Sequence, residues 1–216
     1  MAEEKDIEGE DLPQGTANPV ERADKALLAA VAPYKDEPAV EAIGKFGEIA
    51  DQPPLVALSA ATLAAGVLDG DARLANAGGR MLAAHLLATF VKDRIKARVN
   101  RTRPHVLLEQ GRYEWRLGGS EDGDWQSFPS GHTAGAVAVA RALARDYPGL
   151  AAPAYLAAAT AAAIQVPRCK HYASDLAAGA AIGLLAEAAV DLAARALGER
   201  LGRAEGEKAG EEWREA

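Results

Sequence analysis

The chain has 216 residues, which is enough for one sizeable domain and hardly for two. Its formal net charge of −7 argues against a nucleic-acid partner, and its single cysteine, Cys169, excludes an internal disulfide. Alanine dominates the 49% of residues that are hydrophobic, and aromatic residues make up only 5%. No window shows the sustained Val/Ile/Thr alternation that is typical of a strand. The composition therefore predicts a helical protein.

The chain begins with an acidic leader. Residues 1–12 hold six acidic residues against one lysine and carry most of the net charge. Residues 1–19 also contain residues that break helices and strands, Pro13, Gly15 and Pro19, and they are predicted to be disordered. The leader lacks the basic-then-apolar pattern of a cleaved signal peptide, so any export would depend on internal apolar segments.

Residues 20–197 are predicted to form one helical domain. Its apolar or amphipathic stretches, in chain order, are Glu21–Val31, Gln52–Leu68, Met81–Val91, Gly131–Ala144, Tyr147–Val166 and Leu176–Ala186. Val106–Gln126, rich in glycine and charge, is predicted to be a long loop, and residues 198–216 a charged, helix-prone tail. We therefore predict an all-α bundle of five to six helices.

Some of these stretches are long enough to cross a membrane. Tyr147–Val166 has 20 residues without a charge and Gln52–Leu68 has 17, against about 20 for a bilayer span. A mean hydropathy of −0.11 and the abundance of alanine leave a soluble, alanine-packed bundle as the alternative. We expect a membrane-embedded bundle with a multi-pass location in the cell membrane.

A basic stretch follows the helix predicted at Met81–Val91. Lys96 and Arg103 are seven residues apart, two turns of a helix, so both are expected on one face, with Pro104 ending the helix. Clustered ammonium and guanidinium groups suit a phosphate. The alternative is a basic helix end that complements the helix dipole or lies beside a membrane.

Two further segments add a hydroxyl, a glycine turn and two histidines. Ser130 and Gly131 open an apolar helix, where free N–H groups bind anions, and His132 follows. His171 and Asp175 have the spacing of a carboxylate that orients an imidazole, if the segment is helical, and this would leave the other ring nitrogen as a nucleophile. An ordinary helix cap and a surface pair are the alternatives.

The other two histidines, His85 and His105, are predicted to be structural. His85 lies in an apolar run and His105 follows Pro104. The sequence has no cysteine pair, no HExxH and no carboxylate cluster with histidine spacing, so no metal site is predicted.

Together the three segments resemble the type 2 phosphatidic acid phosphatase superfamily, helical phosphatases that share their site with vanadium haloperoxidases. The family pattern is KxxxxxxRP, then PSGH, then SRxxxxxHxxxD. This chain matches it at Lys96…Arg103-Pro104, at Pro129-Ser130-Gly131-His132 and at His171…Asp175.

The resemblance implies a role for each matching residue. His171 would attack phosphorus and form a phosphohistidine, Asp175 would orient it, and His132 would protonate the leaving oxygen. The phosphate oxygens would be held by Lys96, Arg103, Ser130 and the Gly131 amide. No metal or other cofactor is implied.

One departure from the family pattern affects the phosphate site. The Ser-Arg pair would fall at positions 164 and 165, which are Ile164 and Gln165, and an arginine follows only at Arg168. Either Arg168 reaches the phosphate through a changed turn, which we favour, or Gln165 supplies one neutral hydrogen bond and the charged donor is lost.

We therefore predict a metal-independent phosphatase that cleaves a phosphomonoester or a diphosphate. Its expected substrate is a lipid phosphate or an isoprenoid diphosphate, if the bundle is membrane-embedded. Three alternatives stay open: a soluble acid phosphatase on the same scaffold, a vanadate-dependent haloperoxidase, and a catalytically inert helical membrane protein. The sequence predicts neither the head group nor the oligomeric state.

Overall fold

The computed structural model describes residues 18–215, with the side chains of residues 201, 202 and 204–215 outside the description. Over that range the chain forms eight α-helices and one antiparallel pair of short strands. The predicted all-α class is confirmed, with eight helices in place of five to six. Residues 1–17 of the predicted leader lie outside the described residues.

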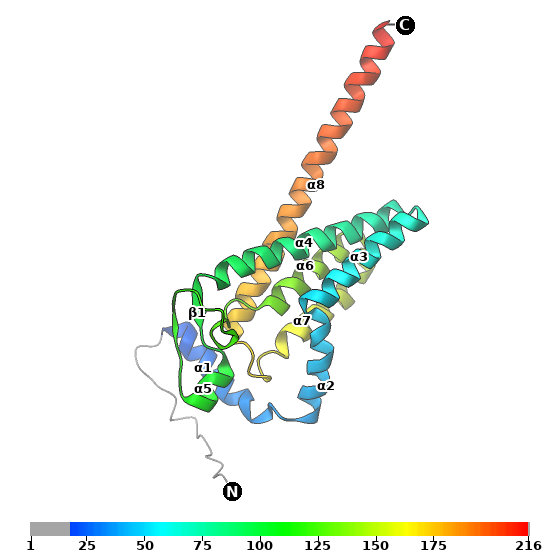
Figure 1. Cartoon of the computed structure of the whole chain (residues 1–216). Coiled ribbons are helices and arrows are strands. Elements are labelled where there is room, and N and C mark those ends of the chain that lie inside the picture. Colours follow the sequence, from blue (N-terminus) through cyan, green and yellow to red (C-terminus); the bar gives the residue numbers. More distant parts are fainter. Residues whose placement is uncertain (1–17, 216) are drawn as a thin grey trace.

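The helices α3, α4, α6, α7 and α8 make up the bundle, and the shorter elements gather at one end of it (Figure 1). The helices are α1 (Pro19–Val31), α2 (Pro38–Gly47), α3 (Gln52–Asp69), α4 (Ala72–Lys96), α5 (Pro104–Gln110), α6 (Gly131–Asp146), α7 (Ala151–Ala163) and α8 (Ala173–Glu215). Strand β1 (Val99–Arg101) pairs with β2 (Trp115–Leu117), with Arg101 opposite Trp115. Helix α8 continues well beyond its neighbours (Figure 1).

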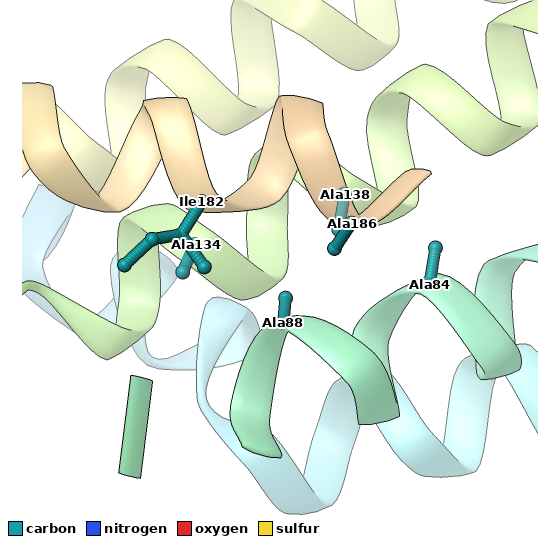
Figure 2. Close-up of a cluster of buried hydrophobic side chains, with 6 residues drawn as sticks. All are labelled: Ala84, Ala88, Ala134, Ala138, Ile182 and Ala186. Atoms are coloured by element: carbon teal, nitrogen blue, oxygen red, sulfur yellow. The ribbon is translucent and has the colours of Figure 1, made fainter. Parts of the chain in front are cut away.

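Small residues let α4, α6 and α8 approach closely. The cluster in Figure 2 consists of Ala84 and Ala88 from α4, Ala134 and Ala138 from α6, and Ile182 and Ala186 from α8. A Cβ on Gly183 would lie only 2.5 Å from the carbonyl oxygen of Ala134, so α8 touches the α6 backbone there. This contact fixes the start of α6 against α8.

Helices α3 and α4 form a hairpin whose contact also depends on glycine. A Cβ on Gly66 would lie 2.2 Å from the nitrogen of Ala75, and one on Gly78 would lie 2.2 Å from the nitrogen of Leu63. Gly70, in the left-handed conformation with φ 68°, ends α3 and makes the turn between the two helices.

A network of ion pairs joins α4, α6 and α8 far from the first turn of α6. Glu187 and Asp191 are almost fully buried, at 1% and 6% exposure. Their partners are the guanidinium groups of Arg80, Arg141, Arg145 and Arg195. The buried carboxylates are thus paired, as buried charges have to be.

The basic stretch is not one helix, so the prediction that Lys96 and Arg103 share a helix face is wrong. Helix α4 ends at Lys96, β1 follows, and Pro104 begins α5 instead of ending a helix. Proline suits the first helical position because its missing N–H is not needed there, and it holds the preceding Arg103 extended.

Two other predicted segments are also divided. The loop predicted at Val106–Gln126 contains most of α5 and all of β2. The uncharged run Tyr147–Val166 is interrupted by a 3-10 turn at Pro148–Leu150, and only Ala151–Ala163 is α-helical. The absence of charge did not reveal the break that Pro148 imposes.

Candidate active site

The segment between α7 and α8 brings His171 into the interior. Cys169 adopts the left-handed conformation with φ 53°, and the backbone N–H groups of Lys170 and His171 both donate to the Gln165 carbonyl, at 3.0 and 3.2 Å. This tight turn sets the Lys170 and His171 side chains at the wall of the same pocket.

The hydrogen bonds of His171 determine which ring nitrogen is free. Its Nδ1 lies 2.8 Å from the carbonyl oxygen of Ser127 and 3.7 Å from Oδ2 of Asp175. Because a carbonyl only accepts, Nδ1 carries the proton and Nε2 keeps its lone pair. Burial lowers the pKa of His171 to about 4, so the ring is neutral at neutral pH. The arrangement presents a nucleophilic nitrogen.

Asp175 is fixed by three donors. Its Oδ2 accepts from the Ser127 hydroxyl at 2.6 Å and from the Tyr172 backbone N–H at 2.9 Å, and its Oδ1 accepts from Arg101 at 2.6 Å. Arg101 is fully buried and also donates to Asp24 of α1 at 2.7 Å. A buried carboxylate–guanidinium–carboxylate triad therefore connects α1 to the histidine environment.

A cavity of about 320 Å³, called here the inner pocket, opens in front of His171. Five predicted site residues line it: Lys96, Arg103, Gly131, His132 and His171. The remaining lining residues are Asp51, Gln52, His85, Thr89, Lys92 and Lys170. The pocket is thus rich in cations and imidazoles.

Backbone carbonyls position the two predicted phosphate-binding cations. Lys96 Nζ donates to the Gln126 carbonyl at 2.6 Å, and Arg103 Nε donates to the Gly123 carbonyl at 2.8 Å. Both carbonyls belong to the segment that leads from β2 to α6. These bonds fix the side chains and leave other donors of each cation for a ligand.

The start of α6 completes the pocket. Ser130 caps the helix, is fully buried, and donates its own backbone N–H to the Asp175 carbonyl at 3.1 Å. It is not among the residues that line the inner pocket. His132 Nε2 lies 3.7 Å from Oδ1 of Asp51, the cap of α3, a pair that the sequence did not suggest.

Several residues near the site were missed by sequence reasoning. Arg101 stands two residues before Arg103 in the basic stretch, and Lys170 directly precedes His171, so a signal existed for both. Asp24 and Asp51 had none, because each is an ordinary acidic residue near a helix start. In the described part of the chain, no group of three or more His, Cys, Asp or Glu side chains is placed to hold a metal ion.

Comparison with known proteins identifies the family. Residues 77–195, more than half of the chain, match the family described as the PAP2 superfamily. The chain belongs to the PAP2 superfamily. The resemblance predicted from the three segments is therefore confirmed.

Solved PAP2 structures share the fold. LpxE from Aquifex aeolicus is similar with a TM-score of 0.57 and 20% identity, over 76% of this chain and 92% of that one. A transmembrane PAP2-type phosphatidylglycerolphosphate phosphatase from Bacillus subtilis is similar with a TM-score of 0.53 and 21% identity, over 82% of this chain and 86% of that one. Among curated proteins no match was found.

This chain differs from the family pattern at the position of the pattern's arginine. Gln165 is fully buried, donates to the Ala161 carbonyl at 3.1 Å, and does not line the inner pocket. Arg168 donates to the Gly44 carbonyl and to Glu48, and lines a separate outer cavity of about 750 Å³. Lys170 lines both cavities.

Proposed function

We propose that this PAP2 protein is a membrane-embedded phosphatase that hydrolyses a lipid phosphate or lipid diphosphate through a phosphohistidine. One observation carries the proposal: a neutral, buried His171 faces a pocket walled by cations, with His132 in the same wall. Such a pocket combines a nucleophile, an acid and charge stabilisation for a phosphoryl group.

The geometry supports a two-step reaction. Nε2 of His171 attacks phosphorus, the bond to the leaving oxygen breaks, and His132 gives that oxygen a proton. A water molecule then attacks the phosphohistidine, with His132 taking its proton, and inorganic phosphate leaves. The nucleophile and the proton donor return to their starting states.

Three cations are proposed to hold the phosphoryl oxygens. Lys96 and Arg103 are those of the family pattern, and the N–H groups at the start of α6 add neutral donors. We assign the third position to Lys170 and not to Arg168. The Arg168 guanidinium already has two partners, whereas Lys170 lies beside His171 in the inner pocket.

The outer surface of the bundle supports a membrane location. Large apolar side chains are exposed on α3, α4, α7 and α8: Leu58, Val67, Leu68, Leu86, Phe90, Tyr155, Leu156, Leu185 and Leu192. Within the described residues, one segment, Ala173–Arg200, meets the length and hydropathy needed to cross a membrane. The charges inside the bundle are paired with one another, as they are in membrane proteins.

An apolar groove supports a lipid as substrate. A cavity of about 210 Å³ between α3, α6 and α7 is lined almost entirely by carbon atoms. It adjoins the inner pocket along three elements: Ala50 precedes Asp51, Met81 lies one turn from His85, and Ala136 lies one turn from His132. We place the hydrocarbon chain of the substrate in this groove.

The test is phosphate release by the purified full-length chain in detergent micelles with EDTA present. Phosphatidic acid is the lipid substrate and p-nitrophenyl phosphate the soluble one. We expect His171→Ala to abolish release from the lipid, whereas His105→Ala, a histidine outside the inner pocket, retains it. If the wild type released phosphate from no phosphoester, the proposed phosphatase function would be refuted. Equal turnover of both substrates, with full recovery in the soluble fraction after carbonate extraction, would favour a soluble phosphatase.

A further inference from the structure

Helix α1 places one acidic side chain in the interior beside the site. Asp24 is 4% exposed and bonds to two segments that carry active-site residues. Its Oδ2 accepts from Arg101 at 2.7 Å and from the Ser174 hydroxyl, and its Oδ1 accepts from the Ser174 backbone N–H at 3.0 Å. Leu28, one turn further along α1, packs against Tyr172 and holds the helix in this place.

Asp24 caps α8 from a distant part of the chain. Helix α8 begins at Ala173, and the first N–H groups of an α-helix have no acceptor within the helix. Asp24 accepts from one of them, that of Ser174, although the two residues are 150 positions apart in sequence. The helix dipole also favours a carboxylate at this end. Asp24 therefore fixes the first turn of α8, which is the turn that carries Asp175.

Arg101 connects Asp24 to Asp175 by a second route. Its Nη2 donates to Asp24, and its Nη1 donates to Asp175 at 2.6 Å and to the Ser174 hydroxyl at 2.7 Å. The Ser174 hydroxyl in turn donates to Asp24, so these side chains form a closed network. Because two carboxylates share the guanidinium, Arg101 does not neutralise Asp175 alone. Negative charge is thus left to act on His171.

That charge is needed when His171 reacts. Nε2 forms the bond to phosphorus while Nδ1 keeps its proton, so the ring becomes a cation. Oδ2 of Asp175 lies 3.7 Å from Nδ1 and stabilises this cation, whereas the positive charges of Lys96 and Arg103 in the inner pocket oppose it. The position and the charge of Asp175 therefore help to set the energy of the phosphohistidine.

We propose that Asp24 is a positioning residue of the phosphatase, which acts through Ser174 and Arg101 on Asp175. The proposal rests on the phosphatase function proposed above. Asp24 lies outside residues 77–195, the part of the chain that matches the PAP2 superfamily, so the match itself assigns it no role. On this proposal, α1 is part of the support of the active site and does not merely precede the catalytic domain.

The kinetics of an isosteric variant test this role. The full-length Asp24→Asn variant is assayed with phosphatidic acid in detergent micelles, and kcat and KM are measured separately. Asp24 does not line the inner pocket. We therefore expect kcat to fall about tenfold, as for a lost hydrogen bond to a charged group, while KM stays within about twofold. Glu21→Gln, the same change of acid to amide one turn earlier on α1, is expected to leave both unchanged.

Two inhibitors separate positioning from a general structural defect. Inorganic vanadate accepts a bond from a nucleophile as phosphorus does in the transition state, whereas inorganic phosphate binds without that bond. We expect Asp24→Asn to raise the inhibition constant of vanadate about tenfold, because a transition-state analogue follows the loss in kcat. The inhibition constant of phosphate, measured in the same buffer without EDTA, is expected to stay unchanged.

Ser174→Ala is a milder perturbation of the same network. It removes the hydroxyl between Arg101 and Asp24 and is expected to lower kcat in the same direction. If Asp24→Asn folds, as judged by circular dichroism, and keeps the kcat of the wild type, the positioning role is refuted while the phosphatase stands. A parallel rise in KM and in both inhibition constants would refute it too. If Asp24→Asn does not fold, an unchanged kcat in Ser174→Ala refutes the role. If the wild type itself releases phosphate from no phosphoester, the proposed function fails.

Discussion

Two adjacent glycines of α4 give a direct test of the helix packing. A Cβ on Gly78 would lie 2.2 Å from the backbone nitrogen of Leu63 and 2.6 Å from its Cα, whereas a Cβ on Gly79 would meet only the tip of the Leu63 side chain, at 4.0 Å. Because backbone atoms cannot rotate away, Gly78→Ala requires α3 and α4 to separate locally by more than about 1 Å to restore ordinary contact.

The free energies follow from these contacts. Overpacking of this kind costs about 1–3 kcal/mol, and the clash with backbone puts Gly78→Ala at the upper end. Alanine in place of glycine gains about 1 kcal/mol of helix propensity at both positions. We therefore expect Gly78→Ala to be destabilising by about 2 kcal/mol and Gly79→Ala to be stabilising by about 1 kcal/mol.

Thermal unfolding of the two variants in the same detergent, followed by far-UV circular dichroism, measures the difference. For a chain of this size about 3 kcal/mol corresponds to a separation of about 6–12 °C between the two midpoints. Equal midpoints for Gly78→Ala and Gly79→Ala would refute the close approach of α3 and α4.

Three further predictions concern the site. Arg101→Gln leaves two buried carboxylates without their cation and is expected to lower the free energy of unfolding by about 3–5 kcal/mol, as measured by thermal unfolding. The control is Arg116→Gln, on the paired strand and exposed, which is expected to change the free energy of unfolding by less than about 0.5 kcal/mol. Similar losses for both variants would contradict the buried triad. The pKa of His171 is lowered from 6.5 to about 4, so the unfolded chain binds a proton first as pH falls, and stability declines between these values by about 3 kcal/mol. A His171→Gln variant that loses as much stability over this pH range as the wild type would contradict that origin. Lys170→Met is expected to lower kcat/KM for phosphatidic acid about tenfold to a hundredfold, with Lys35→Met, in the outer cavity, as the control; unchanged turnover in Lys170→Met would show that another group supplies the third cation.

The parts of the site that the sequence could predict are those carried by short segments. Ser130 caps α6 as predicted, because capping depends on residues within one turn. His171 and Asp175 come close as their spacing suggested, but the ring nitrogen bonds the Ser127 carbonyl. A backbone acceptor can belong to any residue type, so the sequence carries no sign of it.

Tertiary contacts account for what the sequence could not predict. Lys96 and Arg103 line one pocket as expected, yet a strand and not a helix separates them, since the pairing with Trp115–Leu117 competes with helix in that stretch. Arg168 was favoured because of its charge, but its position is determined by Gly44 and Glu48, more than a hundred residues away in sequence. Contacts of that range leave no local pattern.

The length of α8 determines how far its last turns would extend past a bundle that spans a membrane. Asp175 stands in its first turn, and the whole helix has 43 residues, about 65 Å, roughly twice the hydrocarbon thickness of a bilayer. If the bundle spans the membrane as proposed, about 20 residues of α8 complete the crossing and the turns after Arg195 emerge in the opposite compartment. Phosphate would then be released on one side of the membrane, and the charged end of α8 would lie on the other. A tag fused to that end would therefore show which side of the membrane the active site faces.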